Sequence, residues 1–304
     1  MRVQTIAAKQ ILIKNKSDAW FGADYTMNLY KGCFHGCIYC DSRSACYGVE
    51  QFDTVRAKQD ALALLRGELA RKRRTGVIAT GAMSDPYNPF ETREKLTRGA
   101  LEQIAASGFG VAIATKSAQI VRDIDVLQRI RAHAPVLCKI SLTTVDDELA
   151  RILEPHVSLP SERLAALQEL HRAGIPAGIL WMPVLPYLTD SVANMHDLLN
   201  RAYENGARFV YPGWGVTLRG NQRAYFYAQL DRHFPGLSAR YRAQYGDAYA
   251  CATPYLAALV PQFHAFCRSH GLLSDMADIV ADYKQDHSNV QLCMFPSMKK
   301  GGSR

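Results

Sequence analysis

Three cysteines, Cys33, Cys37 and Cys40, lie within eight residues of the chain. Thiolates at this spacing reach one metal centre only if the loop between them folds around it. Gly32 and Gly36 allow the positive φ angles that such a loop needs. A closed zinc site has four ligands, and an ordinary [4Fe–4S] cluster is also held by four cysteines. Three cysteines therefore indicate a cluster in which one iron stays open to another ligand.

A zinc loop is the other interpretation of these cysteines. Its fourth ligand would be His35, Asp41 or Cys46, which all lie close to the triplet in the sequence. We favour the cluster because the motifs further along the chain fit it as well.

The cysteines form a C-x3-C-x2-C motif in which aromatic Tyr39 directly precedes Cys40. This pattern resembles the radical S-adenosylmethionine (SAM) superfamily. The resemblance implies that Cys33, Cys37 and Cys40 hold a [4Fe–4S] cluster, that SAM binds its open iron, and that Tyr39 belongs to the cofactor site. It further implies a flavodoxin- or ferredoxin-type electron donor. The product of SAM cleavage would be a 5′-deoxyadenosyl radical that removes a hydrogen atom from the substrate.

Four further segments at expected strand ends resemble the spore photoproduct lyase branch of that superfamily, which is DNA-repair photolyase-like. In the segment G-x-x-x-D-P-Y, the resemblance places Ser84 beside the methionyl group of SAM and gives Asp85 the role of fixing the loop. Lys116 and Ser141 would bind the SAM carboxylate, and Pro183 would fix a backbone carbonyl towards the adenine. Without a cofactor, Lys116 would be a snorkelling surface residue, Ser141 a plain strand residue and Pro183 part of a rigid turn.

This chain departs from the lyase at the two residues through which the lyase returns a hydrogen atom to its product radical. The lyase has a cysteine where this chain has Ala82, and a tyrosine where this chain has Asp41. Repair of the spore thymine dimer by that route is therefore not expected. Cys46 is a candidate hydrogen donor in their place, and the alternative for Cys46 is a buried structural thiol. Nearly the whole chain resembles the group called radical SAM mobile pair protein B, to which we can assign no reaction.

Aromatic and polar residues gather after the sixth expected strand, and two interpretations of them stay open. They suit either stacking and phosphate contact with nucleic acid or a docking helix with amphipathic aromatics. The residues are Tyr211, Trp214, Arg219, Asn221, Arg223, Tyr225 and Tyr227.

The C-terminal tail contains a second kind of motif. Gln291, Leu292, Met294 and Phe295 lie in the segment Q-L-C-M-F, which resembles the pentapeptide that binds the bacterial DNA sliding clamp. An extended tail would place the three apolar side chains in pockets while Gln291 bonds at the rim. The other interpretation is a short apolar tail folded onto the protein itself.

Alternating strands and helices must position these residues. We expect an α/β fold, and the resemblance makes it a partial (β/α)6 barrel with a helical C-terminal extension. Helices are expected over Thr92–Ser107, Ser161–Ala173 with Ser161 as N-cap, Gly220–His233 and Thr253–His270, and glycines 108, 174 and 206 should end helices. The strands are expected at Tyr25–Tyr30, Gly76–Thr80, Gly110–Thr115, Val136–Thr143, Ile175–Pro183 and Arg208–Pro212.

We divide the chain into an N-terminal segment (1–22), the barrel (23–218), the extension (219–288) and a tail (289–304). No run of residues is long and apolar enough to suggest a membrane span or signal peptide, and the uneven cysteines fit a reducing cytoplasm. The net charge of +8 favours an anionic partner. We therefore expect a radical SAM enzyme acting on nucleic acid. The alternatives are a radical SAM enzyme acting on a peptide or small molecule, and a non-catalytic metal-binding regulator.

Overall fold

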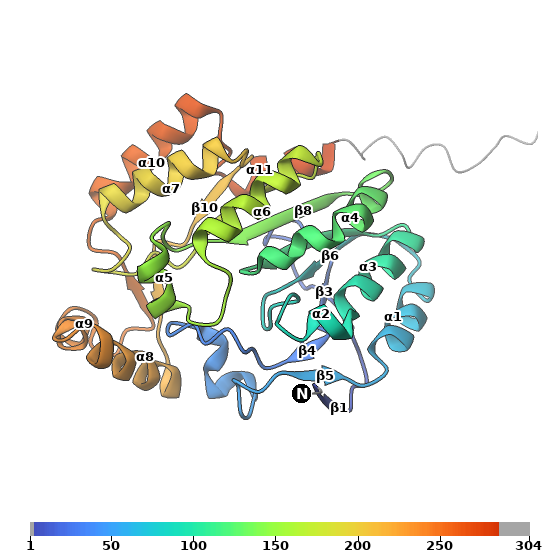
Figure 1. The fold of residues 1–304 in the computed structure, drawn as a ribbon, viewed down its shortest axis with the longest axis horizontal. Coiled ribbons are helices and arrows are strands. Elements are labelled where there is room, and N and C mark those ends of the chain that lie inside the picture. The colour runs from blue at the N-terminus through green and yellow to red at the C-terminus, as the bar shows by residue number, and fades with distance from the viewer. Residues whose placement is uncertain (1–2, 286–304) are drawn as a thin grey trace, which may run out of the picture.

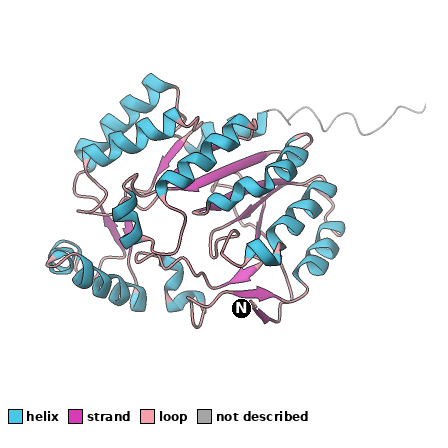
Figure 2. Ribbon diagram, viewed as in Figure 1, coloured by secondary structure: helices cyan, strands magenta, loops and turns pink. Residues whose placement is uncertain are grey.

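The structure is a computed structural model that describes residues 3–285. Its centre is a seven-stranded sheet in the order β10-β9-β8-β7-β6-β3-β2 (Figures 1 and 2). Six strands run parallel, and β2 joins β3 antiparallel at one edge. The strands are β2 (Leu12–Lys14), β3 (Tyr25–Met27), β6 (Val77–Thr80), β7 (Gly110–Thr115), β8 (Val136–Ser141), β9 (Ala177–Trp181) and β10 (Val210–Pro212). The sheet is open, which confirms the partial barrel of six parallel strands, whereas β2 was not expected.

Helices connect the parallel strands and cover the outer face of the sheet (Figure 1). Their apolar faces pack with the strands into one large core, because each helix has buried residues only on one side. These helices are α1 (Ala61–Ala70), α3 (Leu96–Ala106), α4 (Ile124–Arg131), α6 (Pro160–Arg172) and α7 (Val192–Glu204). Glycines 108, 174 and 206 follow α3, α6 and α7 with φ between 72 and 78°, which confirms their expected role at helix ends.

Three local expectations were wrong, and the first two concern the bounds of a strand and of a helix. The strand expected at Tyr25–Tyr30 ends at Met27, and Tyr30–Lys31 forms β4 in a separate sheet with β1 (Gln4–Ile6) and β5 (Arg56–Lys58). The helix expected over Thr92–Ser107 is broken at Lys95, whose φ is 51°, so that α2 (Glu91–Glu94) precedes α3.

The N-cap of α6 is Leu159, one residue before the Pro160 that begins the helix. Ser161 instead lies in the first turn, where its hydroxyl donates to Asp147 at 2.6 Å. Asp147 begins α5 (Asp147–Leu153), so the serine joins two helices rather than capping one.

The chain after β10 is mostly helical, as expected, with α8 (Gly220–His233), α9 (Leu237–Tyr245), α10 (Leu256–His270) and α11 (Met276–Gln285). A short antiparallel pair, β11 (Gly215–Thr217) and β12 (Ala250–Ala252), was missed by the sequence analysis. No helix within residues 3–285 has both the length and the apolar character needed to cross a membrane.

Candidate active site

The cysteine loop begins directly after β4, and its path depends on Gly32. This residue has a φ of 80°, and a Cβ built on it would lie 2.3 Å from the backbone oxygen of Thr54. A side chain there would collide with that backbone. The N–H of Cys33 then donates to the carbonyl of Phe52 at 2.8 Å. The start of the loop is therefore fixed against the segment before β5.

The three thiols of this loop lie close enough to affect one another's pKa; Cys37 is buried, and Cys33 and Cys40 are half-buried. Burial raises the pKa of Cys33 to about 11, and it also raises the pKa of Cys37 and Cys40. Neighbouring thiolates raise the pKa of Cys33 and Cys37 further. Thiolates are the form that binds metal, and the positive charge of bound iron offsets both effects. A donor set of three free, clustered thiols therefore fits a [4Fe–4S] group with one open iron.

The residues considered as a fourth zinc ligand have other surroundings. His35 Nδ1 lies 3.6 Å from Asp85 Oδ2, and the carboxylate of Asp41 lies 2.7 Å from Arg219 Nη2. The side chain of Cys46 is exposed, which corrects the expectation of a buried structural thiol. Across residues 3–285, no three His, Cys, Asp or Glu side chains are grouped closely enough to hold a single metal ion.

Asp85 joins the loop after β6 to the end of β7 and to the cysteine loop. Its Oδ1 accepts from the N–H of Tyr87 at 2.9 Å and from the hydroxyl of Thr115 at 2.7 Å. Its Oδ2 accepts from the N–H of Lys116 at 2.8 Å and faces His35. The aspartate therefore fixes the backbone from which the Lys116 side chain extends.

A buried group of charges lies behind the cysteine loop, and the sequence analysis missed it. Glu154 is 2% exposed and its carboxylate lies 2.5 Å from Arg163 Nη2, while the hydroxyl of Tyr39 donates to its other oxygen. Burial alone would raise the pKa of Glu154, but Arg163 and Lys116 hold it below the usual range. Burial opposes the charge of Lys116, and Cys37 and Glu154 outweigh it, so that its pKa is raised. The group therefore keeps an ammonium ion beside the thiols.

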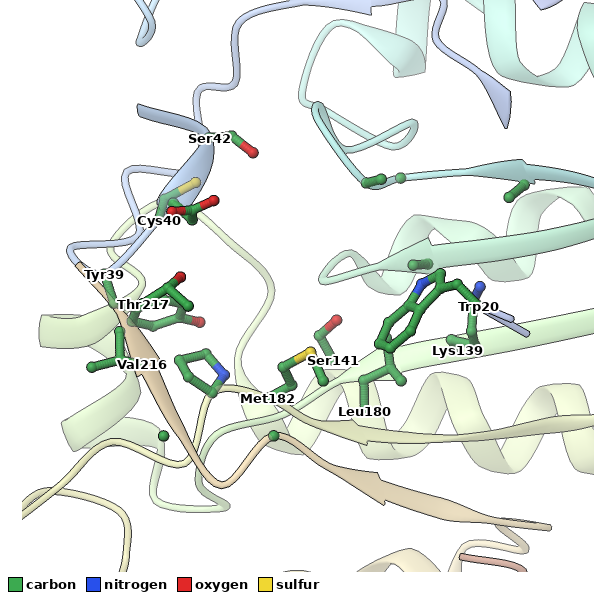
Figure 3. Close-up of a pocket in the computed structure, with 18 of the residues that line it drawn as sticks. Trp20, Tyr39, Cys40, Ser42, Lys139, Ser141, Leu180, Met182, Val216 and Thr217 are labelled. Carbon is green, nitrogen blue, oxygen red and sulfur yellow. The ribbon is translucent and has the colours of Figure 1, made fainter. Parts of the chain in front are cut away.

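A cavity of about 920 Å³ lies within the open barrel, with the cysteine loop at one end (Figure 3). Several residues that the sequence analysis selected line it: Tyr39, Cys40, Lys116, Ser141 and Pro183. They come from the cysteine loop and from the carboxyl ends of β7, β8 and β9, where parallel strands bring distant residues together.

Ser84 has a supporting position instead. Its hydroxyl donates to the carbonyl of Gly32 at 2.6 Å, and so it ties the loop after β6 to the cysteine loop. The cofactor-binding roles of the selected residues stay predictions: Tyr39, Ser84, Asp85, Lys116, Ser141 and Pro183.

The opposite wall of the cavity comes from β11 and β12, which include Val216 and Cys251. Gly215 lies so close to β12 that a Cβ on it would approach the backbone oxygen of Cys251 to 2.3 Å. The Cys251 thiol is buried. Neither strand has the length or alternation that predicts a strand from sequence, and so this wall was missed.

The aromatic and polar residues after β10 contact the protein's own backbone and side chains. Arg219 binds Asp41, and Arg223 donates to the carbonyls of Gly246, Asp247 and Ala248. Asn221 accepts from the N–H of Ala45 at 2.8 Å, Tyr227 is 5% exposed and the guanidinium of Arg43 lies 3.9 Å from the ring of Tyr225. These contacts support the docking interpretation for the residues from Arg219 to Tyr227, because they attach α8 to its surroundings, including the segment that follows the cysteines. Tyr211 lies in β10 and Trp214 lines the cavity.

Comparison with known proteins gave one family match and several relatives. Residues 27–199 match the Radical SAM superfamily. The chain is 33% identical to the uncharacterized protein Rv2578c of Mycobacterium tuberculosis over 286 residues, covering 92% of this chain and 80% of the relative. It is 29% identical to the uncharacterized protein MJ0683 of Methanocaldococcus jannaschii over 172 residues, covering 56% of this chain and 63% of that protein.

Among solved structures, the chain resembles spore photoproduct lyase complexed with dinucleoside spore photoproduct. The TM-score is 0.60 at 15% identity, over 87% of this chain and 78% of the lyase. A lyase variant with bound AdoMet and the same dinucleoside gives a TM-score of 0.61 at 15% identity, over 88% of this chain and 79% of the variant. At this identity the likeness shows the fold alone.

Proposed function

The chain belongs to the radical SAM superfamily, and from that premise we propose that it is a radical SAM enzyme acting on nucleic acid. Its cofactors are a [4Fe–4S] cluster and SAM, which the superfamily uses. When bound, they supply a 5′-deoxyadenosyl radical that removes a hydrogen atom from a substrate. The observation that carries the proposal is the position of Cys40 and Lys116 on one cavity, with Cys33 and Cys37 clustered beside them.

The chain's own residues bind and orient the cofactors in this proposal. Cys33, Cys37 and Cys40 hold the cluster, and Lys116 binds the SAM carboxylate from the end of β7. Asp85 holds the backbone of Lys116, so the ammonium is in place before SAM arrives. Ser141 and Pro183 line the same cavity, where Ser141 would bind the SAM carboxylate and Pro183 would fix a backbone carbonyl towards the adenine.

Nucleic acid is the proposed substrate class on two grounds. The chain has a net charge of +8, and the solved lyase structures whose fold it resembles bind a dinucleoside photoproduct. DNA repair or modification is the proposed role. The position of the lyase thiol corresponds to Ala82, which lines the cavity, and Asp41 is engaged with Arg219. We therefore propose a reaction other than the lyase's hydrogen return through those two positions.

The proposed partners are an electron donor of the flavodoxin or ferredoxin type and the DNA sliding clamp. The clamp motif of Gln291, Leu292, Met294 and Phe295 lies outside the described residues, and its support is the sequence alone. A cytoplasmic location is proposed because an oxygen-sensitive cluster and free thiols fit a reducing compartment.

Anaerobic reconstitution tests the proposed function. The purified chain should bind about four irons, and with a reductant it should convert SAM to 5′-deoxyadenosine. A non-catalytic metal-binding protein would fail the second step. Deuterated single-stranded DNA, duplex DNA and a peptide pool are then supplied in turn. The substrate is the one whose deuterium appears in 5′-deoxyadenosine, and transfer from the peptide pool alone would refute the nucleic-acid proposal.

A further inference from the structure

The far end of the cavity holds a buried lysine that the cofactors do not account for. Lys139 lies in β8, two residues before Ser141, so both side chains point to the same face of the sheet. Lys139 is 2% exposed and lines the cavity. Figure 3 shows Lys139 and Trp20 at one end and Tyr39 and Cys40 at the other. The lysine is therefore remote from the residues that hold the cluster.

The ammonium of Lys139 has no counter-charge among the residues that the structure describes. Within residues 3–285, no carboxylate lies within ion-pair distance of it, and its Nζ lies 4.5 Å from the centre of the Phe21 ring. Burial lowers its pKa to about 8, and the nearby Cys138 thiol offsets little of this effect. Such a group is costly to keep in a folded protein unless something pairs with it.

The charges that line the cavity leave a positive excess for a ligand. Lys16, Lys116 and Lys139 line it, and Asp41 is the acidic residue among its described lining residues. Asp41 is already bound by Arg219, and Lys116 lies beside the thiols and Glu154. Lys139 and exposed Lys16 therefore remain for an anionic group, and SAM uses only one carboxylate.

An aromatic surface lies next to this lysine. The indole of Trp20 is 47% exposed, lines the cavity, and is 5.0 Å from the ring of Phe21, the same ring that Lys139 contacts. The ring of Tyr211 lies 5.7 Å from the indole and 5.5 Å from the ring of Phe21, so two mutually packed rings hold the indole in place. The half-exposed indole can stack on a flat ring, and the unpaired ammonium beside it can bind a phosphate that the same ligand carries.

We propose that this end of the cavity binds a nucleotide unit of the substrate, with Lys139 pairing with a phosphate oxygen and Trp20 stacking on the base. The inference rests on the proposed nucleic-acid function and assigns the residues that recognise the substrate. Lys139 and Trp20 are then substrate-binding residues, and the other end of the cavity holds the cluster and SAM.

Binding of a fluorescent single-stranded DNA dodecamer to the reconstituted protein with SAM tests the proposal. Lys139→Met should weaken binding at least tenfold and reduce the salt dependence by about one phosphate contact, because one charge pair is lost. Trp20→Ala should weaken binding about tenfold with the salt dependence unchanged. Lys58→Met is the matched control, since Lys58 is half-buried outside the cavity lining and its removal should leave binding unchanged.

Two further measurements separate this inference from the function on which it rests. Lys139→Met should still cleave SAM with a reductant and should melt at a higher temperature than the wild type, because a buried unpaired charge is removed. Loss of SAM cleavage would show that Lys139 acts in the cofactor site and not in substrate binding. A lower melting temperature would show that Lys139 supports the fold, and either result would overturn the proposal. Wild-type protein that cleaves SAM but binds an acidic peptide of equal length more tightly than DNA would overturn the phosphate assignment. Failure of the wild type to cleave SAM would refute the proposed function, whatever the binding result.

Discussion

The carboxylate of Asp41 accepts two bonds from the guanidinium of Arg219, which lies 178 positions further along the chain. The Nε–Oδ1 distance is 3.0 Å and the Nη2–Oδ2 distance is 2.7 Å. Asp41 directly follows the third cysteine, and Arg219 directly precedes α8. The C-terminal extension is thus attached to the residue next to the cluster loop.

The first prediction concerns this ion pair. Arg219→Met should release the end of the cysteine loop, so iron should leave the reconstituted protein roughly twofold to fivefold faster in the presence of a chelator. Absorbance of the cluster follows the loss. Arg172→Met removes a more exposed ion pair with Glu169, on a helix away from the cysteine loop, and should leave the rate unchanged. Equal rates in the wild type and Arg219→Met would show that the pair does not hold the loop.

The second prediction concerns the cluster ligands. Replacing Cys33, Cys37 or Cys40 with alanine should abolish SAM cleavage, because three thiolates leave no spare ligand. Iron content and 5′-deoxyadenosine are measured together. Cys267→Ala is the control, since Cys267 is buried in the core away from the loop. A full cluster in Cys33→Ala would show that the ligands are wrongly assigned.

The third prediction concerns the SAM site. Lys116→Ala should still assemble the cluster but bind SAM more weakly, and the loss of a charge-assisted hydrogen bond corresponds to roughly 1.5–3 kcal/mol. Glu154 keeps Arg163 as its partner in the variant, so the fold should persist. Equilibrium dialysis measures the affinity for SAM. An unchanged affinity would remove Lys116 from the cofactor site.

The fourth prediction concerns stability and pH. Burial lowers the pKa of Lys139 to about 8, so below that pH the folded state holds a charge that the unfolded state holds more easily. Lys139→Met should raise the free energy of unfolding by about 3 kcal/mol at pH 7. The gain should shrink as pH rises from 8 towards the unfolded value of 10.5, because the wild-type lysine then loses its proton in both states. Urea unfolding at pH 7 and pH 10 measures both values, and a gain that grew with pH would contradict the assignment.

The fifth prediction concerns the tail. If the clamp proposal is right, the intact protein should capture the bacterial sliding clamp in a pull-down, because the side chains of the Q-L-C-M-F segment would fill pockets on the clamp. Gln291→Ala combined with Phe295→Ala should abolish capture. No capture by the intact protein, or equal capture by both proteins, would refute the clamp proposal.

Sequence patterns predicted the features that depend on the order of neighbouring residues along the chain. The run Gly110–Thr115 became β7 at the expected bounds, and Lys116 follows it, because an apolar strand that ends in a cation is visible in the sequence. The pairing of Glu154 with Arg163 could not be predicted, since a buried ion pair depends on how α5 and α6 pack. Lys139 had no signal of its own either. The folded structure is needed to show that Lys139 faces a cavity and that no carboxylate of residues 3–285 lies near it.

The two edges of the open sheet approach each other through aromatic side chains, where Trp20 and Phe21, before β3, contact Tyr211 of β10, and Phe21 also contacts Phe209. Hydrogen-bonded strands would fix the separation of these edges through their register, whereas an edge-to-face ring contact sets no register. The width of the opening between these edges therefore depends on packed aromatic side chains rather than on backbone pairing. Evolution could therefore alter the size of this opening by exchanging these rings, while every strand pairing in the sheet stays the same.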